Sequence, residues 1–162
     1  MFTTMKWQKQ LVVGVWGALL LMVLLCGCLS MRPSGGMRSA SRKMVVTGYC
    51  ACGTCCNWRR NTAGVPVIAS GAKQGQRKAV GMTASGARAR VGTIAADPDI
   101  FPFGTIMYVE GYGYGRVEDT GSDIKGYHID LFFRSHAEAK QWGRRRTQVV
   151  VWAPSDMARE RS

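Results

Sequence analysis

Residues 127–133 have the sequence Tyr-His-Ile-Asp-Leu-Phe-Phe, and this stretch indicates the fold most clearly. Successive side chains of a β-strand point to opposite faces. One face would carry Tyr127, Ile129, Leu131 and Phe133, and the other His128, Asp130 and Phe132. An aspartate in an apolar strand costs free energy to bury unless it is paired or protonated. Asp130 is therefore a candidate functional residue.

Further runs of this kind begin at Met44 and are separated by Gly, Pro and Asn, whereas helical periodicity is scarce. This pattern predicts an all-β domain with strands at 44–49, 65–68, 91–95, 105–110, 114–118, 127–133 and 147–152. Seven short strands favour a barrel. A helix of about two turns is predicted after Ser135, because Ser135 and Glu138 fit a capping box and Gly143 supplies a left-handed end. Residues 57–78 are rich in Gly, Gln, Arg and Lys and predict an exposed, mobile loop or hairpin.

The composition fits one small domain. A chain of 162 residues with 46% apolar content is about one domain long and can supply a core, which excludes a multidomain protein and wholesale disorder. The 22 Lys and Arg residues outnumber the 10 Asp and Glu residues, giving a net charge of +12. This charge favours an anionic partner, such as wall polymer, lipid headgroup or nucleic acid, without choosing among them.

The N-terminal segment has the pattern of an export signal. Residues 11–29 are uncharged and follow Lys6 and Lys9. The segment is also long enough to span a bilayer as an uncleaved anchor. Residues 25–28, Leu-Cys-Gly-Cys, resemble a lipobox, which makes Cys28 a candidate for lipidation. We expect a lipoprotein first, an anchor second and a secreted protein third, all outside the cytoplasm. The predicted parts are a signal peptide or anchor (1–28), a tether (29–43), the domain (44–153) and a tail (154–162).

Four cysteines lie within seven residues, at Cys50, Cys52, Cys55 and Cys56. Cys52 and Cys55 have the spacing of a zinc knuckle, but a structural zinc site usually takes its second ligand pair from a distant segment. The chain offers no second cysteine pair there, and its histidines, His128 and His136, are far along the sequence. In an exported domain the expectation is two disulfides, with the pairing open, rather than a metal. We predict no metal or other cofactor.

A set of short motifs resembles the three-aspartate (3D) domain, which is shared by membrane-bound lytic transglycosylase A and by small wall-remodelling proteins of bacteria. The motifs are Thr83-Ala84-Ser85-Gly86, Gly92-Thr93-Ile94-Ala95-Ala96-Asp97-Pro98, Phe103-Gly104-Thr105, Glu118-Asp119-Thr120-Gly121, Ile124-Lys125-Gly126 and Ile129-Asp130-Leu131-Phe132. The resemblance covers about residues 44–152 and implies a six-stranded double-psi β-barrel with one short helix near its C-terminal end.

The resemblance implies cleavage of the MurNAc–GlcNAc β-1,4 bond of peptidoglycan without water, leaving a 1,6-anhydro sugar end. The family's acid and base position matches Asp130, with Asp119 and Asp97 as the other two aspartates of the site. Candidates to bind the sugar or the peptide stem are Thr83, Ser85 and Lys125. The expected partners are glycan strands and, through the N-terminal lipid or anchor, the membrane of a bacterial cell envelope. Export argues against nucleic acid.

Two other functions compete with this one. The same barrel fits a non-catalytic module that binds or loosens the wall, because a fold does not by itself fix a function. A cysteine hydrolase is disfavoured, since the clustered cysteines have no arranged histidine in the sequence. The chain also has no room for the second domain that forms the groove of the large transglycosylase, so we expect weak affinity for long glycans.

Overall fold

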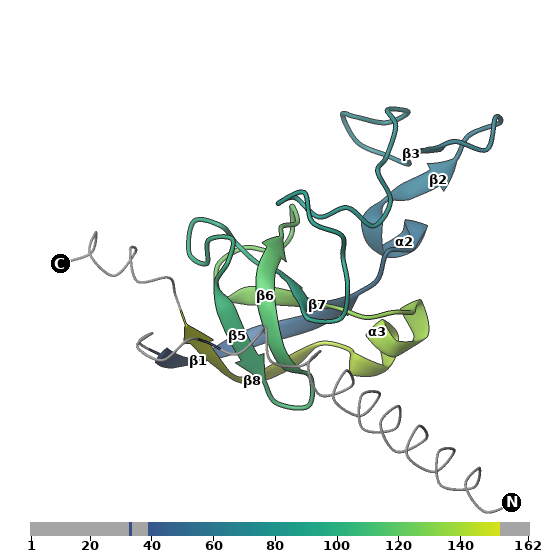
Figure 1. The fold of residues 1–162 in the computed structure, drawn as a ribbon. Helices are drawn as coiled ribbons and strands as arrows, with labels where there is room; N and C mark the ends of the chain where they lie inside the picture. The colour runs from purple at the N-terminus through teal and green to yellow at the C-terminus, as the bar shows by residue number, and fades with distance from the viewer. Residues whose placement is uncertain (1–32, 34–38, 153–162) are drawn as a thin grey trace, which may run out of the picture. The chain divides into compact units, whose positions relative to one another are not determined.

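The computed structural model describes residue 33 and residues 39–152, and in this part of the chain six strands close a barrel (Figure 1). The order around the barrel is β1–β7–β4–β6–β5–β8. The strands are β1 (Ser39–Tyr49), β4 (Thr93–Ala95), β5 (Ile106–Val109), β6 (Gly113–Asp119), β7 (His128–Phe132) and β8 (Arg145–Trp152). The predicted all-β fold with a six-stranded barrel is confirmed.

The predicted signal or anchor, Cys28 and the tail lie outside the described residues. Among the residues that are described, no helix is long and apolar enough to cross a membrane. Strand β1 begins at Ser39, so residues 39–43 of the predicted tether belong to a strand that pairs with β8.

One predicted strand does not join the barrel. β3 (Pro66–Ile68) pairs instead with β2 (Trp58–Arg60), a strand that the sequence pattern did not predict. The two strands form a hairpin within residues 57–78, the segment for which the sequence predicted a loop or a hairpin. The hairpin follows a single helical turn, α2 (Gly53–Cys56), and the Trp58 indole N–H donates to the Ala51 carbonyl at 2.9 Å, which ties it to the cysteine segment.

The strand register positions the polar side chains. β1 runs parallel to β7, with Thr47 opposite Asp130. β4 lies between β7 and β6, and its Ala95 is paired with Asp130 on one side and with Asp119 on the other. Neighbouring strands are ~4.8 Å apart, so the two aspartates are separated by roughly 10 Å along the sheet with a methyl group between them.

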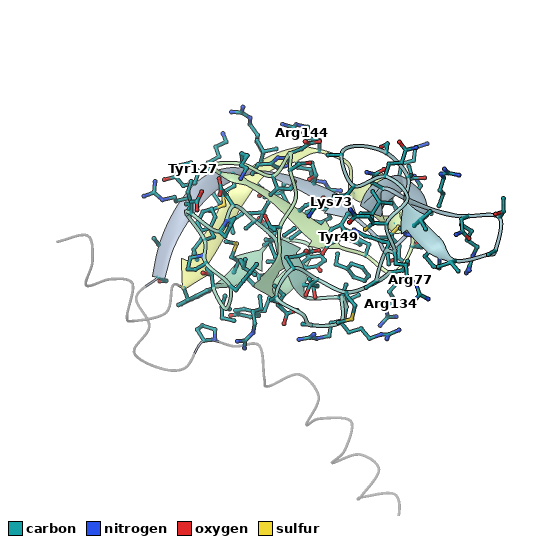
Figure 2. The ribbon with its side chains drawn as sticks, turned by 90° about the horizontal axis from the view of Figure 1, so that it is seen from above. Tyr49, Lys73, Arg77, Tyr127, Arg134 and Arg144 are labelled. Carbon is teal, nitrogen blue, oxygen red and sulfur yellow. The ribbon has the colours of Figure 1, made fainter. Side chains whose placement is uncertain are left out.

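The barrel interior is apolar. Ile129 and Leu131 of β7 are fully buried, as the alternation predicts, together with Met44, Val46, Ile94, Met107, Val109, Val117 and Val149. Burial of such side chains contributes ~1.5–3 kcal/mol each. Phe132 and Tyr49 pack edge to face in a second cluster at one end of the barrel. Tyr49 is buried, and Figure 2 shows it within the molecule, with Arg144 and Arg134 towards opposite edges of the view.

The predicted helix is α3 (His136–Trp142), which packs against β1. Ser135 caps it by accepting the Glu138 N–H at 3.2 Å, and Gly143 ends it with a positive φ of 67°. The Glu138 carboxylate accepts from the Arg134 N–H rather than from Ser135. Gly48 allows the close packing, because a Cβ there would lie 2.9 Å from the Phe133 ring and 3.1 Å from the Ala139 carbonyl.

Candidate active site

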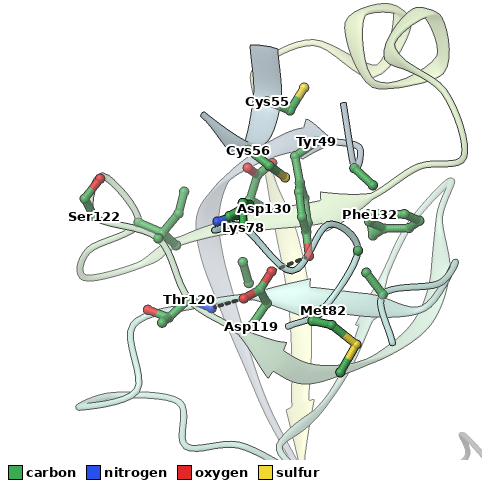
Figure 3. A pocket seen from close by; sticks show the side chains of 16 residues that line it. Tyr49, Cys55, Cys56, Lys78, Met82, Asp119, Thr120, Ser122, Asp130 and Phe132 are labelled. Atoms are coloured by element: carbon green, nitrogen blue, oxygen red, sulfur yellow. Dashed lines mark hydrogen bonds between the residues drawn. The ribbon is translucent and has the colours of Figure 1, made fainter. Parts of the chain in front are cut away.

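A cavity of about 330 Å³ opens at the end of the barrel where β1, β6 and β7 finish (Figure 3). Asp119 and Asp130 both line it, and so does Ala95, whose small side chain leaves the space between them open. The side chains around these three include Tyr49, Cys55, Cys56, Lys78, Met82, Thr120, Ser122, Ile124 and Phe132.

Asp130 is the more isolated of the two carboxyl groups. Its Oδ1 accepts one side-chain hydrogen bond, from the Thr47 hydroxyl at 2.9 Å. Burial raises the pKa of Asp130 to about 6, and the charge of Asp119 adds to the rise, while the Thr47 bond opposes it. A group with this pKa exchanges its proton near neutral pH, as a residue that acts first as an acid and then as a base must.

Thr47 also connects Asp130 to a histidine. The Thr47 Oγ1 lies 3.0 Å from His128 Nε2, and the other ring nitrogen lies 3.3 Å from the Asp123 carbonyl. Burial lowers the pKa of His128, which favours the neutral ring. His128 lines a second, strongly basic cavity of about 360 Å³, whose charged residues are Lys43, Lys125, Arg144 and Arg146. A line of hydrogen-bonding groups therefore leads from Asp130 to this second cavity.

Asp119 is held by three hydrogen bonds. Its Oδ1 accepts from the backbone N–H groups of Thr120 at 2.9 Å and Ala84 at 3.0 Å, and its Oδ2 accepts from the Tyr49 hydroxyl at 3.0 Å. Burial, with the charge of Asp119, raises the pKa of Tyr49 far above its ordinary value, so the phenol stays protonated and donates. These bonds hold the Asp119 carboxylate in one position on the wall of the cavity that Asp130 also lines.

The structure does not bring the other predicted catalytic and substrate-binding residues into this cavity. The Asp97 carboxylate accepts from the Gly126 N–H at 2.9 Å and faces the Lys125 ammonium at 3.9 Å, and the Gly126 bond lowers the pKa of Asp97 most. Thr83 is buried and donates to the Ala87 carbonyl, and its hydroxyl lies 3.1 Å from that of Ser85. Thr83 and Ser85 shape the turn whose Ala84 N–H holds Asp119.

Three residues of the site were missed from the sequence: Tyr49 and Lys78, which line the cavity, and Thr47, which binds Asp130. Thr47 and Tyr49 lie two positions apart on β1, so their side chains share one face of the strand. The sequence alone does not show that this face lies beside β7, which carries Asp130. Lys78 is the one basic side chain among the described residues that line the cavity. It lies in a Gly- and Gln-rich segment where a solvated lysine is the ordinary expectation.

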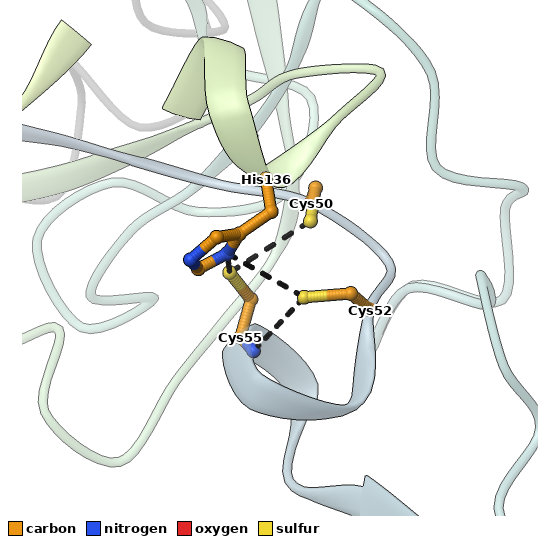
Figure 4. Close-up of side chains that lie close together, drawn as sticks. All are labelled: Cys50, Cys52, Cys55 and His136. Atoms are coloured by element: carbon orange, nitrogen blue, oxygen red, sulfur yellow. Dashed lines mark hydrogen bonds between the residues drawn. The ribbon is translucent and has the colours of Figure 1, made fainter. Parts of the chain in front are cut away.

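The predicted disulfides do not occur in the structure. All four cysteines of the described residues are free thiols, and the Cys50 and Cys55 sulfurs are 3.8 Å apart, against ~2.05 Å in a disulfide. Cys56 donates to the Cys50 carbonyl at 3.2 Å, and burial raises the pKa of this thiol to about 11, so it is not a nucleophile at neutral pH. The other three cysteines lie beside His136 (Figure 4).

Part of the chain is similar to known proteins. Residues 92–153 match the family model of the 3D domain. The expected resemblance to the 3D domain is thus confirmed, and the 3D domain match spans strands β4 to β8 with all three aspartates.

Two relatives come from Bacillus subtilis (strain 168). A proposed cell wall shaping protein, YabE, is 45% identical over 58 residues, which are 36% of this chain and 14% of YabE. The cell wall-binding protein YocH is 47% identical over 58 residues, which are 36% of this chain and 20% of YocH. The chain therefore spans a fifth or less of the length of these relatives.

Solved structures of MltA from E. coli, a lytic transglycosylase, also match part of this chain. One is 23% identical with a TM-score of 0.37 and covers 49% of this chain and 30% of that chain. Another, with bound chitohexaose, is 22% identical with a TM-score of 0.35 and covers 45% of this chain and 28% of that chain.

Proposed function

We propose that the cavity between Asp119 and Asp130 binds a glycan strand of peptidoglycan and cleaves its MurNAc–GlcNAc β-1,4 bond, leaving a 1,6-anhydroMurNAc end. The observation that carries this proposal is Asp130, a partly buried carboxyl group in a cavity, beside a second carboxylate, with a pKa raised to about 6. The 3D domain match and the wall-related names of the relatives support the substrate class.

In the first step Asp130 is protonated and donates its proton to the glycosidic oxygen as the bond from that oxygen to C1 of MurNAc breaks. Positive charge develops on the sugar ring, in the oxocarbenium-like manner of glycoside cleavage. The fixed carboxylate of Asp119 stabilises this charge, since its three hydrogen bonds hold it in place before the reaction begins.

In the second step the ionised Asp130 takes the proton of the C6 hydroxyl of the same MurNAc, and the C6 oxygen bonds to C1. The departing GlcNAc keeps the first proton as its C4 hydroxyl, and Asp130 ends protonated again. No water is consumed, and one carboxyl group serves as acid and base. Thr47 positions Asp130 in both states, because its hydroxyl can donate to the carboxylate or accept from the acid.

The remaining expectations belong to this proposal. We infer that the barrel is of the double-psi type, which the two parallel strand pairs, β1–β7 and β4–β6, support. We also propose that the domain works outside the cytoplasm in a bacterial cell envelope, held to the membrane by a lipid on Cys28 or by an uncleaved anchor. The uncharged stretch at 11–29 supports this placement.

A non-catalytic wall-binding module is the second candidate. The name of the relative YocH, a cell wall-binding protein, favours it. The cavity volume of about 330 Å³ also favours it, because this is near the lower end for ligand sites and leaves most of a glycan strand outside.

The two candidates are separated by incubating the full chain with purified peptidoglycan and analysing the soluble products by mass spectrometry. We expect anhydro-muropeptides from the wild type and from Asp99→Asn, a control that makes the same change at an exposed residue away from the cavity. Asp130→Asn should release at least about a thousandfold less, because it loses the general acid and base. Equal sedimentation of all three proteins with the wall would show that binding is retained.

The absence of anhydro products from the folded wild-type protein, with wall binding intact, would overturn the enzymatic proposal and support the binding module.

A further inference from the structure

Four side chains from three segments converge beside the cavity. Cys50 directly follows β1, Cys52 and Cys55 lie before and within α2, and His136 begins α3. Their three sulfurs and the Nδ1 of His136 all lie within 4.8 Å of one another (Figure 4). The histidine is separated from Cys55 by 81 positions in the sequence, so the fold and not the local chain brings it here.

The distances match those between the ligands of a tetrahedral metal ion. With Zn–S bonds of ~2.3 Å and Zn–N bonds of ~2.05 Å, a regular tetrahedron places two sulfurs ~3.8 Å apart and a sulfur ~3.6 Å from a nitrogen. The Cys50 and Cys55 sulfurs are 3.8 Å apart. The His136 Nδ1 lies 3.6 Å from the Cys52 sulfur and 3.4 Å from the Cys55 sulfur.

We propose that Cys50, Cys52, Cys55 and His136 bind one zinc ion as a structural site. Three sulfurs and one imidazole nitrogen suit zinc and exclude magnesium and calcium, which take oxygen ligands. Four protein ligands fill the tetrahedron, so the ion has no open position for a substrate and supplies no catalysis. On binding, each cysteine that coordinates as a thiolate releases its proton to solvent, and the histidine binds through a neutral ring.

The surroundings of the cluster support metal ligation more than disulfide formation. The Cys55 N–H donates to the Cys52 sulfur at 3.4 Å, and such second bonds orient metal ligands. A disulfide between Cys50 and Cys55 would use two of the sulfurs and give the imidazole no role. Cys56 has a different partner, the Cys50 carbonyl, and is the natural control for the other three.

The ion would connect two parts of the chain at the edge of the cavity. β1 and β7 are parallel, so their carboxyl ends lie at the same end of the barrel, and the segments that follow them carry Cys50 and His136. Cys55 also lines the wall of the cavity that holds Asp130. Zinc would therefore fix this wall and the start of α3 whether or not the cavity cleaves glycan.

Metal binding by the full chain, purified and kept under reducing conditions, tests the proposal. We expect one zinc ion per chain by elemental analysis, and Co²⁺ substitution should give the absorption of tetrahedral cobalt with thiolate-to-metal charge transfer. Cys52→Ser and His136→Ala should each weaken Co²⁺ binding by at least about a hundredfold. Cys56→Ser should bind as the wild type does, with the same charge-transfer intensity.

Removal of the ion with a chelator should lower the Tm of the wild type and of Cys56→Ser, and leave that of Cys52→Ser unchanged. Three results would each overturn the proposal: less than about a tenth of an ion per chain with the four thiols reduced, equal Co²⁺ binding by Cys52→Ser and Cys56→Ser, or disulfides among Cys50, Cys52 and Cys55 in protein isolated from the envelope with zinc supplied.

Discussion

Asp119 and Asp130 are the same amino acid, and the barrel gives them different chemistry through their neighbours. Asp119 accepts three hydrogen bonds, two of them from backbone N–H groups, which hold its carboxylate in place. Asp130 accepts one side-chain hydrogen bond, from Thr47, and its burial together with the charge of Asp119 raises its pKa. Proton transfer therefore belongs to Asp130 and charge stabilisation to Asp119 in the proposed reaction.

The pH dependence of cleavage follows from this difference. Because the acid step needs protonated Asp130, kcat/KM should fall about tenfold per pH unit above an apparent pKa of about 6. Asp119→Asn removes the negative charge that raises the pKa of Asp130, so the descending limb should move to lower pH. Anhydro-muropeptide release measured from about pH 4 to about pH 8 tests both points. An unmoved limb in Asp119→Asn would contradict the coupling.

The same carboxyl group should reduce stability at neutral pH. The pKa of Asp130 is higher in the folded protein than its ordinary value of 3.8, so the folded state binds the proton more tightly, and stability is lost as the pH rises through about 6. Asp130→Asn should therefore raise the free energy of unfolding at pH ~7.5 by on the order of 2 kcal/mol. At pH ~4 the gain should be small. Urea unfolding at the two pH values provides the measurement, and an equal gain at both would refute the explanation.

At the scale of elements, the strands of the barrel and the helix follow from local pattern. The alternation over 127–133 predicted the strand β7, and the Ser135 cap predicted the helix α3. The pairing of strands did not follow, because the parallel contact that puts Thr47 opposite Asp130 joins residues 83 positions apart. The contact between His136 and the cysteines was not predicted for the same reason, because 81 positions separate His136 from Cys55. The sequence predicts an element where its contacts are local. It does not predict the site, which is made by contacts between residues far apart in the sequence.

Strand β4 gives a test of the cavity, since it alone lies between β6 and β7 and carries Ala95 between the two aspartates. Ala95→Leu should fill this space and lower kcat/KM for soluble glycan fragments by at least about tenfold, at a stability cost of ~1–3 kcal/mol. Ala95→Ser, which is nearly the same size, is the matched control and should retain activity. Wild-type activity in a folded Ala95→Leu protein would place the reaction outside this cavity.

At the scale of the whole molecule, the net charge of +12 is carried partly by exposed basic side chains, such as Lys73, Arg77, Arg134 and Arg144, which Figure 2 labels. Attraction between these charges and an anionic wall is screened by salt, with a Debye length of ~14 Å at about 0.05 M and ~4 Å at about 0.5 M. The fraction that sediments with peptidoglycan should therefore fall severalfold between these salt concentrations. Salt-independent sedimentation would show that recognition rests on the cavity alone.

The pairing of the first and last strands of the barrel has a further consequence. Ser39, where β1 begins, lies opposite Trp152, where β8 ends, so the chain enters and leaves the barrel at adjacent points. A domain with neighbouring ends can be inserted into a surface loop of another protein with two short linkers and without separating the host's own segments. With this geometry the barrel can be transferred as one unit, by evolution or by an engineer, between proteins of very different length.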